Sequence, residues 1–338
     1  MLLVALVLVG GSGYAVWTNL DSLLGLTTPL ESKDFPGPGG DQVNVEIPEG
    51  ATGTAMGEEL YEAGVVASVP AFTAAFEANP ESVLIRPGTH TMLEEMPARD
   101  AVALLVKNET ADLQLTIPEG YTVDQIVERA VQVTGLPAKD FEAALKRPAK
   151  IGLPKVAEGE AEGWLYPDTY MVKPNDTAGG LLSQMVDRTT KLLRQKGVAD
   201  ADRQSVLIKA SLVEREGFHA EDKPKIAQAI ENRLADDMIL QIDAAVAYGA
   251  GKPGTDLTNA DKENAKNPYN TYEHTGLPPG PIANPGEVAI DAVLKPTPGD
   301  WKFWVTVNLD TGETKFAADF EEHQRNVEEL REWQAANG

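Results

Sequence analysis

A strand-to-helix pattern occurs twice in this chain and limits how it can fold. VNVEIPEGAT (43–52) and LQLTIPEGYT (113–122) each alternate apolar and polar residues, as a half-buried strand does, and continue into Ile-Pro-Glu-Gly, a Thr and a helical pattern. Pro ends the strand, Gly permits a tight turn, and Thr52 or Thr54, and likewise Thr122, can cap the following helix. Two related substructures would explain the repeat, and so would a turn that simply suits a strand-to-helix connection.

The same patterns predict an α+β chain with two folded units, for which 338 residues are enough. Residues 43–110 are expected to form a small α/β subdomain whose order and size resemble a LysM-like glycan-binding module. Its predicted elements are a strand from Val43, helices at 55–63 and 68–78, a strand at 88–92 and a helix at 98–107.

Residues 111–338 are predicted to form the second, mixed α+β domain. Residues 249–300 are rich in Gly, Pro and Asn, so we expect mostly loop there, and long loops in compact domains are usually functional. Helices are predicted at 123–134, 138–146, 177–195, 201–216, 222–235 and 319–335, and a hairpin at 302–308 and 313–317.

The first 18 residues are predicted to be a transmembrane anchor. Leu2–Trp17 has no charged residue, and its length is at the lower limit for a membrane span. Residues 19–42 include PGPGG and read as a linker. The first basic residue is Lys33, so a secretory signal peptide, which also needs a basic start, is the competing interpretation. We expect a basic cytoplasmic stretch before Met1.

Composition and missing motifs narrow the chemistry to carboxylates. The net charge of −23 repels phosphate backbones, so no nucleic-acid partner is expected. The absence of cysteine removes thiol nucleophiles and Cys-ligated zinc, and the four histidines lie far apart, so neither a metal nor a cofactor is predicted. The signatures of serine acyl transfer and of phosphate-binding loops are also missing.

The segment SVLIKASLVEREG (205–217) is predicted to be a helix that carries a catalytic acid. Helical spacing puts Glu214 on the apolar face, whereas Glu216 lies on a polar line with Lys209 and is expected to be solvated. A carboxyl on an apolar face loses hydration, which favours the protonated form that a general acid needs near neutral pH. An ion pair of Glu214 with an arginine, with Arg233 as the candidate, is the structural alternative.

Two further segments offer sugar-binding side chains. Gln241 and Asp243 alternate with apolar residues, which predicts that both point to one face of an extended segment. In the loop at 267–286, tyrosines can stack on sugar rings and the polar residues between them can bond to hydroxyls. The alternatives are that the amide and the carboxylate satisfy nearby backbone, and that the loop is a rigid structural one.

Taken together, these segments resemble the endolytic murein transglycosylase (YceG-like) family, and the resemblance covers about residues 43–335. The family's motifs fall here in its order and at its spacings: EGWLYPDTY (162–170), SLVERE (211–216), ENRL with LQID (231–243), YGAG (248–251), and YNTY with GLPPGPIANPG (269–286). The resemblance implies a single-pass protein of the cell membrane, with a LysM-like subdomain and a lytic-transglycosylase domain outside the cytoplasm. The absent basic start is a departure from the family.

The resemblance also implies the site and its partners. It gives Glu214, the first Glu of SLVERE, as the catalytic residue. It implies peptidoglycan glycan strands as substrate, cell-wall synthesis machinery as a possible partner, and no cofactor. The residues expected to contact the glycan are Gln241, Asp243, Tyr248, Tyr269, Asn270, Thr271 and Tyr272.

The family's reaction needs one carboxyl. It protonates the oxygen between MurNAc and GlcNAc, and the same group then deprotonates the sugar's own C6 hydroxyl, which closes a 1,6-anhydro ring without water. Ordinary glycosidases need a second carboxylate. A hydrolytic muramidase with Asp243 as that second group, and a non-catalytic peptidoglycan-binding scaffold, are the competing functions.

Overall fold

The computed structural model describes residues 33–107 and 110–337, which divide into two compact units, one ending at Asp112 and one beginning at Leu113. The predicted anchor at 1–18 and most of the predicted linker at 19–42 lie outside these residues. Within them, no helix is both long and apolar enough to cross a membrane. The described residues form helices and three two-stranded antiparallel sheets, so the mixed α+β class is confirmed for this part of the chain.

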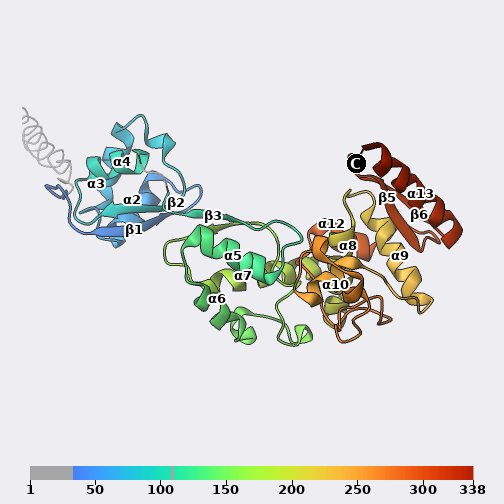
Figure 1. Ribbon diagram of the computed structural model, residues 1–338. Helices are drawn as coiled ribbons and strands as arrows, with labels where there is room; N and C mark the ends of the chain where they lie inside the picture. The colour runs from blue at the N-terminus through green and yellow to red at the C-terminus, as the bar shows by residue number, and fades with distance from the viewer. Residues whose placement is uncertain (1–32, 108–109, 338) are drawn as a thin grey trace, which may run out of the picture. The chain divides into compact units, whose positions relative to one another are not determined.

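The first unit has the predicted element order (Figure 1). Strand β1 pairs antiparallel with β2, and the helices bury a core that includes Leu60, Phe72 and Met92. Its resemblance to a LysM module stays a prediction. Its elements are β1 (Gln42–Ile47), α2 (Gly53–Glu62), α3 (Val69–Ala78), the 3-10 helix η2 (Ser82–Leu84), β2 (Gly88–Leu93) and α4 (Ala98–Lys107).

Both Ile-Pro-Glu-Gly segments connect a strand to a capped helix, as predicted. The Thr52 hydroxyl accepts from the Ala55 N–H at 3.2 Å, and the Thr122 hydroxyl accepts from the Gln125 N–H at 3.3 Å. The repeat extends further, because each unit runs strand, two helices, antiparallel partner strand, helix. This shared order favours two related substructures over a shared turn sequence alone.

The second unit begins with that repeated order and continues into a helical region. Its first part contains β3 (Leu113–Thr116), α5 (Val123–Thr134), α6 (Ala138–Leu145), the 3-10 helices η3 (Pro148–Ile151) and η4 (Lys155–Ala157), β4 (Thr169–Val172) and α7 (Ala178–Gln195). Its core includes Ile126, Phe141 and Trp164. Here too the predicted helices are confirmed, with bounds that differ from those predicted by at most one residue.

The helical region is built around α8, which is buried along most of its length and packs against α9, α10 and α12. Two of these helices were not predicted: α10 begins at Asp243, the last residue of the segment expected to be extended, and α12 lies in the region expected to be loop. Both have only eight residues. The elements are η5 (Asp200–Asp202), α8 (Arg203–Glu216), α9 (Lys223–Ala235), α10 (Asp243–Ala250), η6 (Gly254–Asp256), α11 (Asn259–Lys262) and α12 (Glu287–Leu294).

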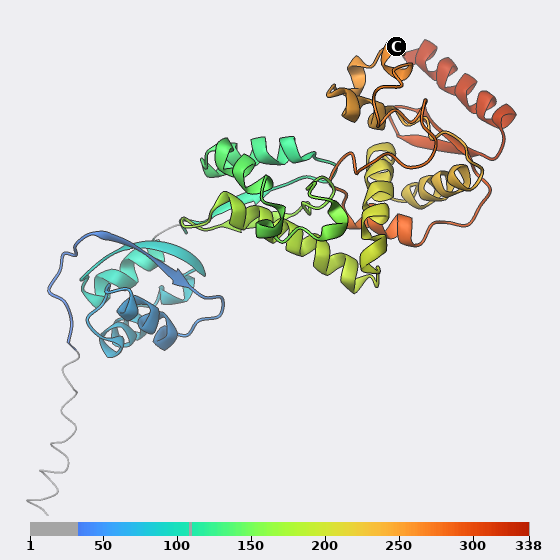
Figure 2. The same cartoon turned by 90° about the horizontal axis from the view of Figure 1, so that it is seen from below.

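The predicted hairpin and final helix close the chain. Strand β5 (Phe303–Asn308) pairs with β6 (Glu313–Ala317), and α13 (Phe320–Asn337) packs along them, as Figure 2 shows in red. Trp304 of β5 donates a hydrogen bond from its indole nitrogen to Glu216 at the end of α8, at 3.2 Å. The hairpin thus reaches the helix that was predicted to carry the catalytic residue.

Candidate active site

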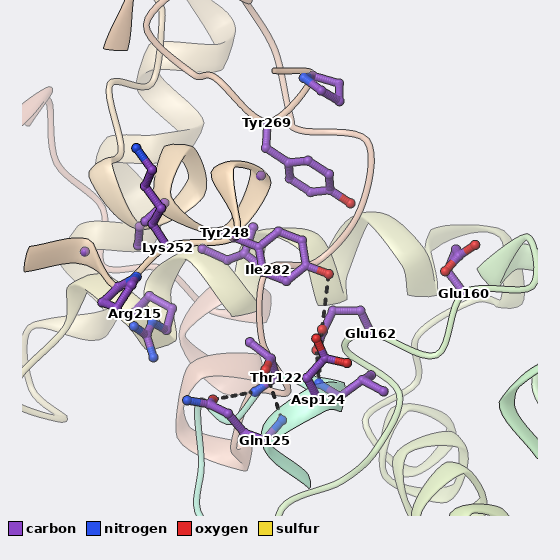
Figure 3. Close-up of a pocket in the computed structure, with 18 of the residues that line it drawn as sticks. Thr122, Asp124, Gln125, Glu160, Glu162, Arg215, Tyr248, Lys252, Tyr269 and Ile282 are labelled. Atoms are coloured by element: carbon purple, nitrogen blue, oxygen red, sulfur yellow. Dashed lines mark hydrogen bonds between the residues drawn. The ribbon is translucent and has the colours of Figure 1, made fainter. Parts of the chain in front are cut away.

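A cavity of about 1160 Å³ lies in the second unit (Figure 3). Its walls come from the start of α5, residues 159–162, the end of α8, α10 with residues 251–254, and Pro268–Tyr269. Its lining holds more acids than bases: Asp124, Glu160, Glu162, Glu216 and Asp243 against Arg215 and Lys252. An acidic lining is suited to a neutral or cationic ligand rather than to an anion.

Glu216, the last residue of α8, lines this cavity, so the expectation that it is solvated is wrong. The residue is half-buried, and its carboxylate accepts the Trp304 hydrogen bond. Burial of the carboxyl raises the pKa of Glu216 above its ordinary value, and the charge of Asp243 adds to this rise. The Trp304 bond and the charges of Arg233 and Arg215 oppose it. A protonatable carboxyl at a cavity wall can act as a general acid.

Glu214 is buried as predicted, but in an ion pair and not in apolar surroundings. Its carboxylate accepts from the Lys223 ammonium at 2.8 Å, with 9% and 7% of the two side chains exposed. It also accepts from the Gly286 N–H at 3.2 Å, at the start of α12. Glu214 therefore ties α8 to α9 and α12, and it does not appear among the residues that line the cavity.

Arg233, the expected alternative partner of Glu214, is occupied elsewhere. Its guanidinium donates to the carbonyls of Lys302 at 2.5 Å and Leu240 at 2.6 Å. It also lies over the Trp304 ring, 4.8 Å from the centroid. Arg233 thereby holds β5 against α9, which supports the indole that contacts Glu216.

Glu162 is a buried acid of the cavity wall that the sequence did not single out, although it begins the EGWLYPDTY motif. It accepts from the Val123 N–H at 3.1 Å, from the Asn284 side-chain amide at 2.8 Å and from the Tyr248 hydroxyl at 3.2 Å. Burial raises the pKa of Glu162 to about 7, against the hydrogen bonds from Val123 and Tyr248. Its place as the first residue of that motif was the signal that the sequence offered.

Tyr248, Tyr269 and Asp243 are the predicted binding residues that line the cavity. The two tyrosine rings meet edge to face, with centroids 4.9 Å apart. Such half-buried aromatic rings offer apolar surface and a hydroxyl to a sugar. They come together because α10 and the loop after α11 lie side by side.

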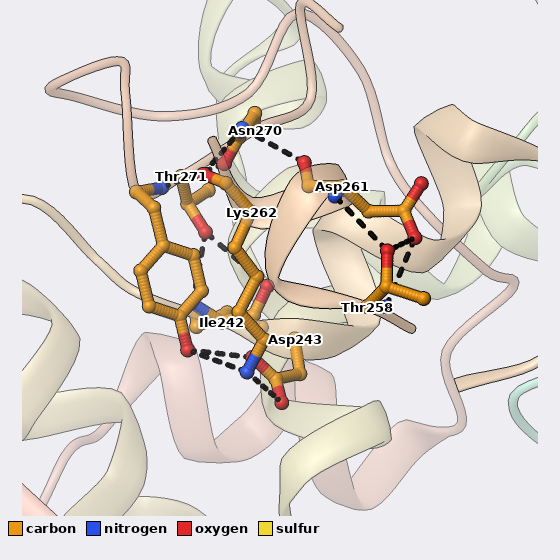
Figure 4. Close-up of polar contacts among 8 residues, drawn as sticks. Ile242, Asp243, Thr258, Asp261, Lys262, Asn270 and Thr271 are labelled. Carbon is orange, nitrogen blue, oxygen red and sulfur yellow. Dashed lines mark hydrogen bonds and ion pairs between the residues drawn. The ribbon is translucent and has the colours of Figure 1, made fainter. Parts of the chain in front are cut away.

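Tyr272 and Asp243 form a polar group at the start of α10 (Figure 4). The Tyr272 hydroxyl donates to Asp243 at 2.6 Å, and the Lys262 ammonium donates to Asp243 at 2.8 Å. Tyr272 itself is half-buried and outside the cavity lining. Its contact with Asp243 nevertheless links it to the cavity wall.

Asn270 and Thr271 are buried, and their polar atoms serve the loop backbone. The Asn270 amide donates to the carbonyls of Lys262 at 3.0 Å and Asn264 at 3.1 Å, and it also reaches Asp261. The Thr271 hydroxyl accepts from the Ile242 N–H at 2.8 Å. Figure 4 shows both side chains pointing into this network. The rigid-loop interpretation therefore describes these two residues.

Gln241 does not share a face with Asp243. Its φ of 47° is left-handed, its N–H donates to the Thr271 carbonyl at 2.9 Å, and its exposed side chain is not among those lining the cavity. The predicted extended segment is thus wrong, because α10 starts at Asp243. Among the residues described, no three His, Asp or Glu side chains are grouped as a metal site requires.

Comparisons with known proteins agree on the family. A model described as the YceG-like family matches residues 45–329. A protein of Streptococcus pneumoniae strain R6 named endolytic murein transglycosylase is 32% identical over 367 aligned residues, which cover 97% of this chain and 64% of the relative. One with the same name from Bacillus subtilis strain 168 is 29% identical and covers 85% of this chain and 84% of the relative.

A solved structure extends the agreement to the fold. The crystal structure of a YceG-like protein from Listeria monocytogenes matches with a TM-score of 0.54 and 28% identity, over 85% of this chain and 99% of that one. This chain spans 64% of the length of the streptococcal relative. The chain belongs to the YceG-like family.

Proposed function

We propose that this chain is an endolytic peptidoglycan lytic transglycosylase that cleaves the bond between MurNAc and GlcNAc and leaves a 1,6-anhydroMurNAc end. The observation that carries the proposal is the Glu216 carboxyl, which has a raised pKa and lines a cavity together with Tyr248 and Tyr269. The names of the streptococcal and Bacillus relatives support the same activity.

Glu216 supplies both proton transfers in this proposal. Its protonated carboxyl gives a proton to the glycosidic oxygen, the C1–O bond breaks, and the sugar develops oxocarbenium character. The resulting carboxylate takes the proton of the C6 hydroxyl, and O6 bonds to C1. At the end of the reaction Glu216 is protonated again, and no water has been consumed.

In this proposal Glu214 is not the catalytic residue, although the motif resemblance implied that it is. Its carboxylate is paired with Lys223 and accepts a hydrogen bond from Gly286, and these contacts join three helices. We therefore assign it to positioning the last turn of α8, where Glu216 lies. Glu214→Gln and Glu216→Gln together decide between the two assignments.

A hydrolytic muramidase is the second candidate, because Asp243 lies in the same cavity as Glu216. Its carboxylate accepts hydrogen bonds from Lys262 and Tyr272, which hold it in place at the start of α10. Mass analysis of digested peptidoglycan separates the candidates: anhydro ends mean transglycosylation, and reducing ends mean hydrolysis. A wild-type protein that binds strands and cuts none would instead be a scaffold.

We further propose that residues 1–18 anchor the protein in the cell membrane, with the rest outside the cytoplasm, where it trims or terminates nascent strands beside the synthesis machinery. The charge-free run and the Pro/Gly-rich linker motivate this. Fractionation tests it: recovery of the full chain with cytoplasmic proteins would rule the anchor out.

A further inference from the structure

Glu162 and Tyr248 form a hydrogen-bonded pair in the cavity wall. Neither residue has a role in the proposed reaction. Both residues line the cavity, and the Tyr248 hydroxyl donates to Glu162 at 3.2 Å. Figure 3 shows the hydroxyl pointing at the carboxylate. Edge-to-face contact with Tyr269 fixes the ring that carries this hydroxyl.

The other contacts of Glu162 describe an ionised carboxylate. One oxygen accepts from Asn284 and from the Val123 N–H, and the other accepts from the same N–H and from Tyr248. All of these partners donate to Glu162 in this arrangement, and Tyr248 is the one among them whose group could also accept a hydrogen bond from a proton on Glu162. Val123 is also the first residue of α5, where the helix dipole favours negative charge.

The pairing decides what Tyr248 can offer to a ligand. A phenol hydroxyl has one proton, and Tyr248 donates it to Glu162. Only the lone pairs of the Tyr248 oxygen are then available to a ligand in the cavity, so Tyr248 can accept a hydrogen bond but not donate one. Protonated Glu162 would instead donate to Tyr248, which would turn the phenol proton toward the cavity. One proton on Glu162 therefore reverses the hydrogen-bond polarity of Tyr248.

We propose that Tyr248 accepts a hydrogen bond from a donor group of the glycan, such as an acetamido N–H, and that Glu162 is the positioning residue that fixes this polarity. The inference rests on the proposed function for the identity of the glycan. An amide N–H can only donate, so the wrong polarity of Tyr248 leaves two donors facing each other, which weakens binding.

The charges around Glu162 make the polarity sensitive to pH near neutrality. Burial raises its pKa to about 7. Asp124 of α5 raises it further by its charge, and Tyr248 of α10 lowers it by its hydrogen bond. Two further titratable residues line the same cavity: Tyr269, and Glu160 in the same loop as Glu162. Glycan binding should therefore strengthen as the pH rises through about 7.

The test measures binding without cleavage. In a Glu216→Gln background, which also removes the titration of Glu216, un-cross-linked glycan strands are titrated at pH 6 and pH 8. We expect about three- to tenfold tighter binding at pH 8, the effect of one neutral hydrogen bond. Adding Glu162→Gln should weaken binding at pH 8 to the pH 6 level and remove the pH dependence, because the amide donates to Tyr248 as a protonated Glu162 would.

Further variants separate positioning from folding. Tyr248→Phe keeps the contacts of Glu162 to Val123 and Asn284 and should also remove the pH dependence. The Glu162→Gln/Tyr248→Phe double variant should bind no worse than Tyr248→Phe alone. The exposed neighbour Glu158, as Glu158→Gln, is the matched control and should keep the pH dependence. Melting temperatures at both pH values monitor folding.

Two results overturn the inference: unchanged pH dependence in either single variant, or losses that multiply in the double variant, as they would for a purely structural Glu162. Anhydro-end release by the wild-type protein, measured in parallel, tests the proposed function separately. Release combined with pH-independent binding would overturn this inference alone, whereas absence of both release and binding would overturn the proposed function as well.

Discussion

Two glutamates that are two positions apart in α8 lie in opposite electrostatic surroundings. Glu214 forms a buried ion pair with Lys223, whose ammonium lies 2.8 Å from its carboxylate. Glu216 has Asp243 near it and loses hydration, so its neutral form is favoured. These surroundings are the basis for proposing Glu216 as the general acid and Glu214 as a residue that positions the end of α8.

Glu216→Gln should abolish cleavage and keep the fold. Gln retains the size of Glu and can accept from Trp304, but it cannot give up a proton. General acid–base catalysis contributes about 10² to 10⁴ in rate, and a residue that serves as acid and base should reach the upper end. Anhydro-muropeptide release by the purified variant measures the loss. Cleavage at the wild-type rate would refute the assignment.

Glu214→Gln should instead destabilise the protein. Lys223 would remain buried without its counter-charge, and breaking a buried ion pair by removing one partner costs roughly 3 to 5 kcal/mol. Urea unfolding of the second unit should detect this loss. Residual cleavage by the folded fraction is expected. A variant that is fully stable yet inactive would return the catalytic role to Glu214.

Glu162 should make the stability of the protein depend on pH. Its pKa rises from 4.5 to about 7 on folding, so the folded state keeps a proton that the unfolded state releases in this window. Its contribution is fully present below pH 4.5 and is lost as the pH rises to about 7. Relative to Glu162→Gln, the wild type should lose about 3 kcal/mol of unfolding free energy between pH 4.5 and 8. A constant difference between the two proteins would contradict the raised pKa.

At the residue scale, helical spacing predicts which side chains a helix itself turns inward, but not which side chains from elsewhere in the chain contact them. Helical spacing correctly buries Glu214, because periodicity depends only on α8 itself. It cannot show that Trp304, 88 positions along the chain from Glu216, covers the other glutamate. For the same reason Asn270 and Thr271 were predicted to bind sugar, although their partners are loop carbonyls and a backbone N–H that no local pattern identifies.

At the element scale, strong local signals predicted the elements well. Helix α5 has a Thr cap, a capping box with Gln125 and a Gly at its end, and its bounds are those expected. Helices α10 and α12 have eight residues each, lack a side-chain cap and are mostly apolar, so neither periodicity nor caps indicate them. Packing against α8 stabilises both.

The loop that carries Tyr269 and Tyr272 depends on Asn270. Asn270→Ala would leave partly buried loop carbonyls without their donor, which costs on the order of 1 to 3 kcal/mol for each one that water cannot reach. Glycan binding should weaken because the tyrosines lose their support. Hydrogen exchange of residues 261–275 measures the loosening, and the exposed Glu273, as Glu273→Ala, serves as the control. Equal protection in both variants would show that the network is dispensable.

At the scale of the whole molecule, each unit has a hydrophobic core of its own. The buried cluster of the first unit runs from Val45 to Leu105, and that of the second from Leu115 to Val293. Every residue that lines the cavity belongs to the second unit. Folding of the site therefore needs no core residue from the first unit.

Residues 113–338 alone should consequently fold and cut glycan strands. The isolated unit keeps its full core, the Glu214–Lys223 pair and the complete cavity lining, so its unfolding transition should match one found in the full chain. Calorimetry of the full chain should accordingly show a second transition that disappears when the first unit is removed. Because the proposed chemistry needs only Glu216 and the substrate, short strands should still yield anhydro ends. If the truncated protein has no cooperative transition, the two units depend on each other for folding. If it folds and cuts nothing, the first unit supplies something to catalysis that its separate core does not reveal.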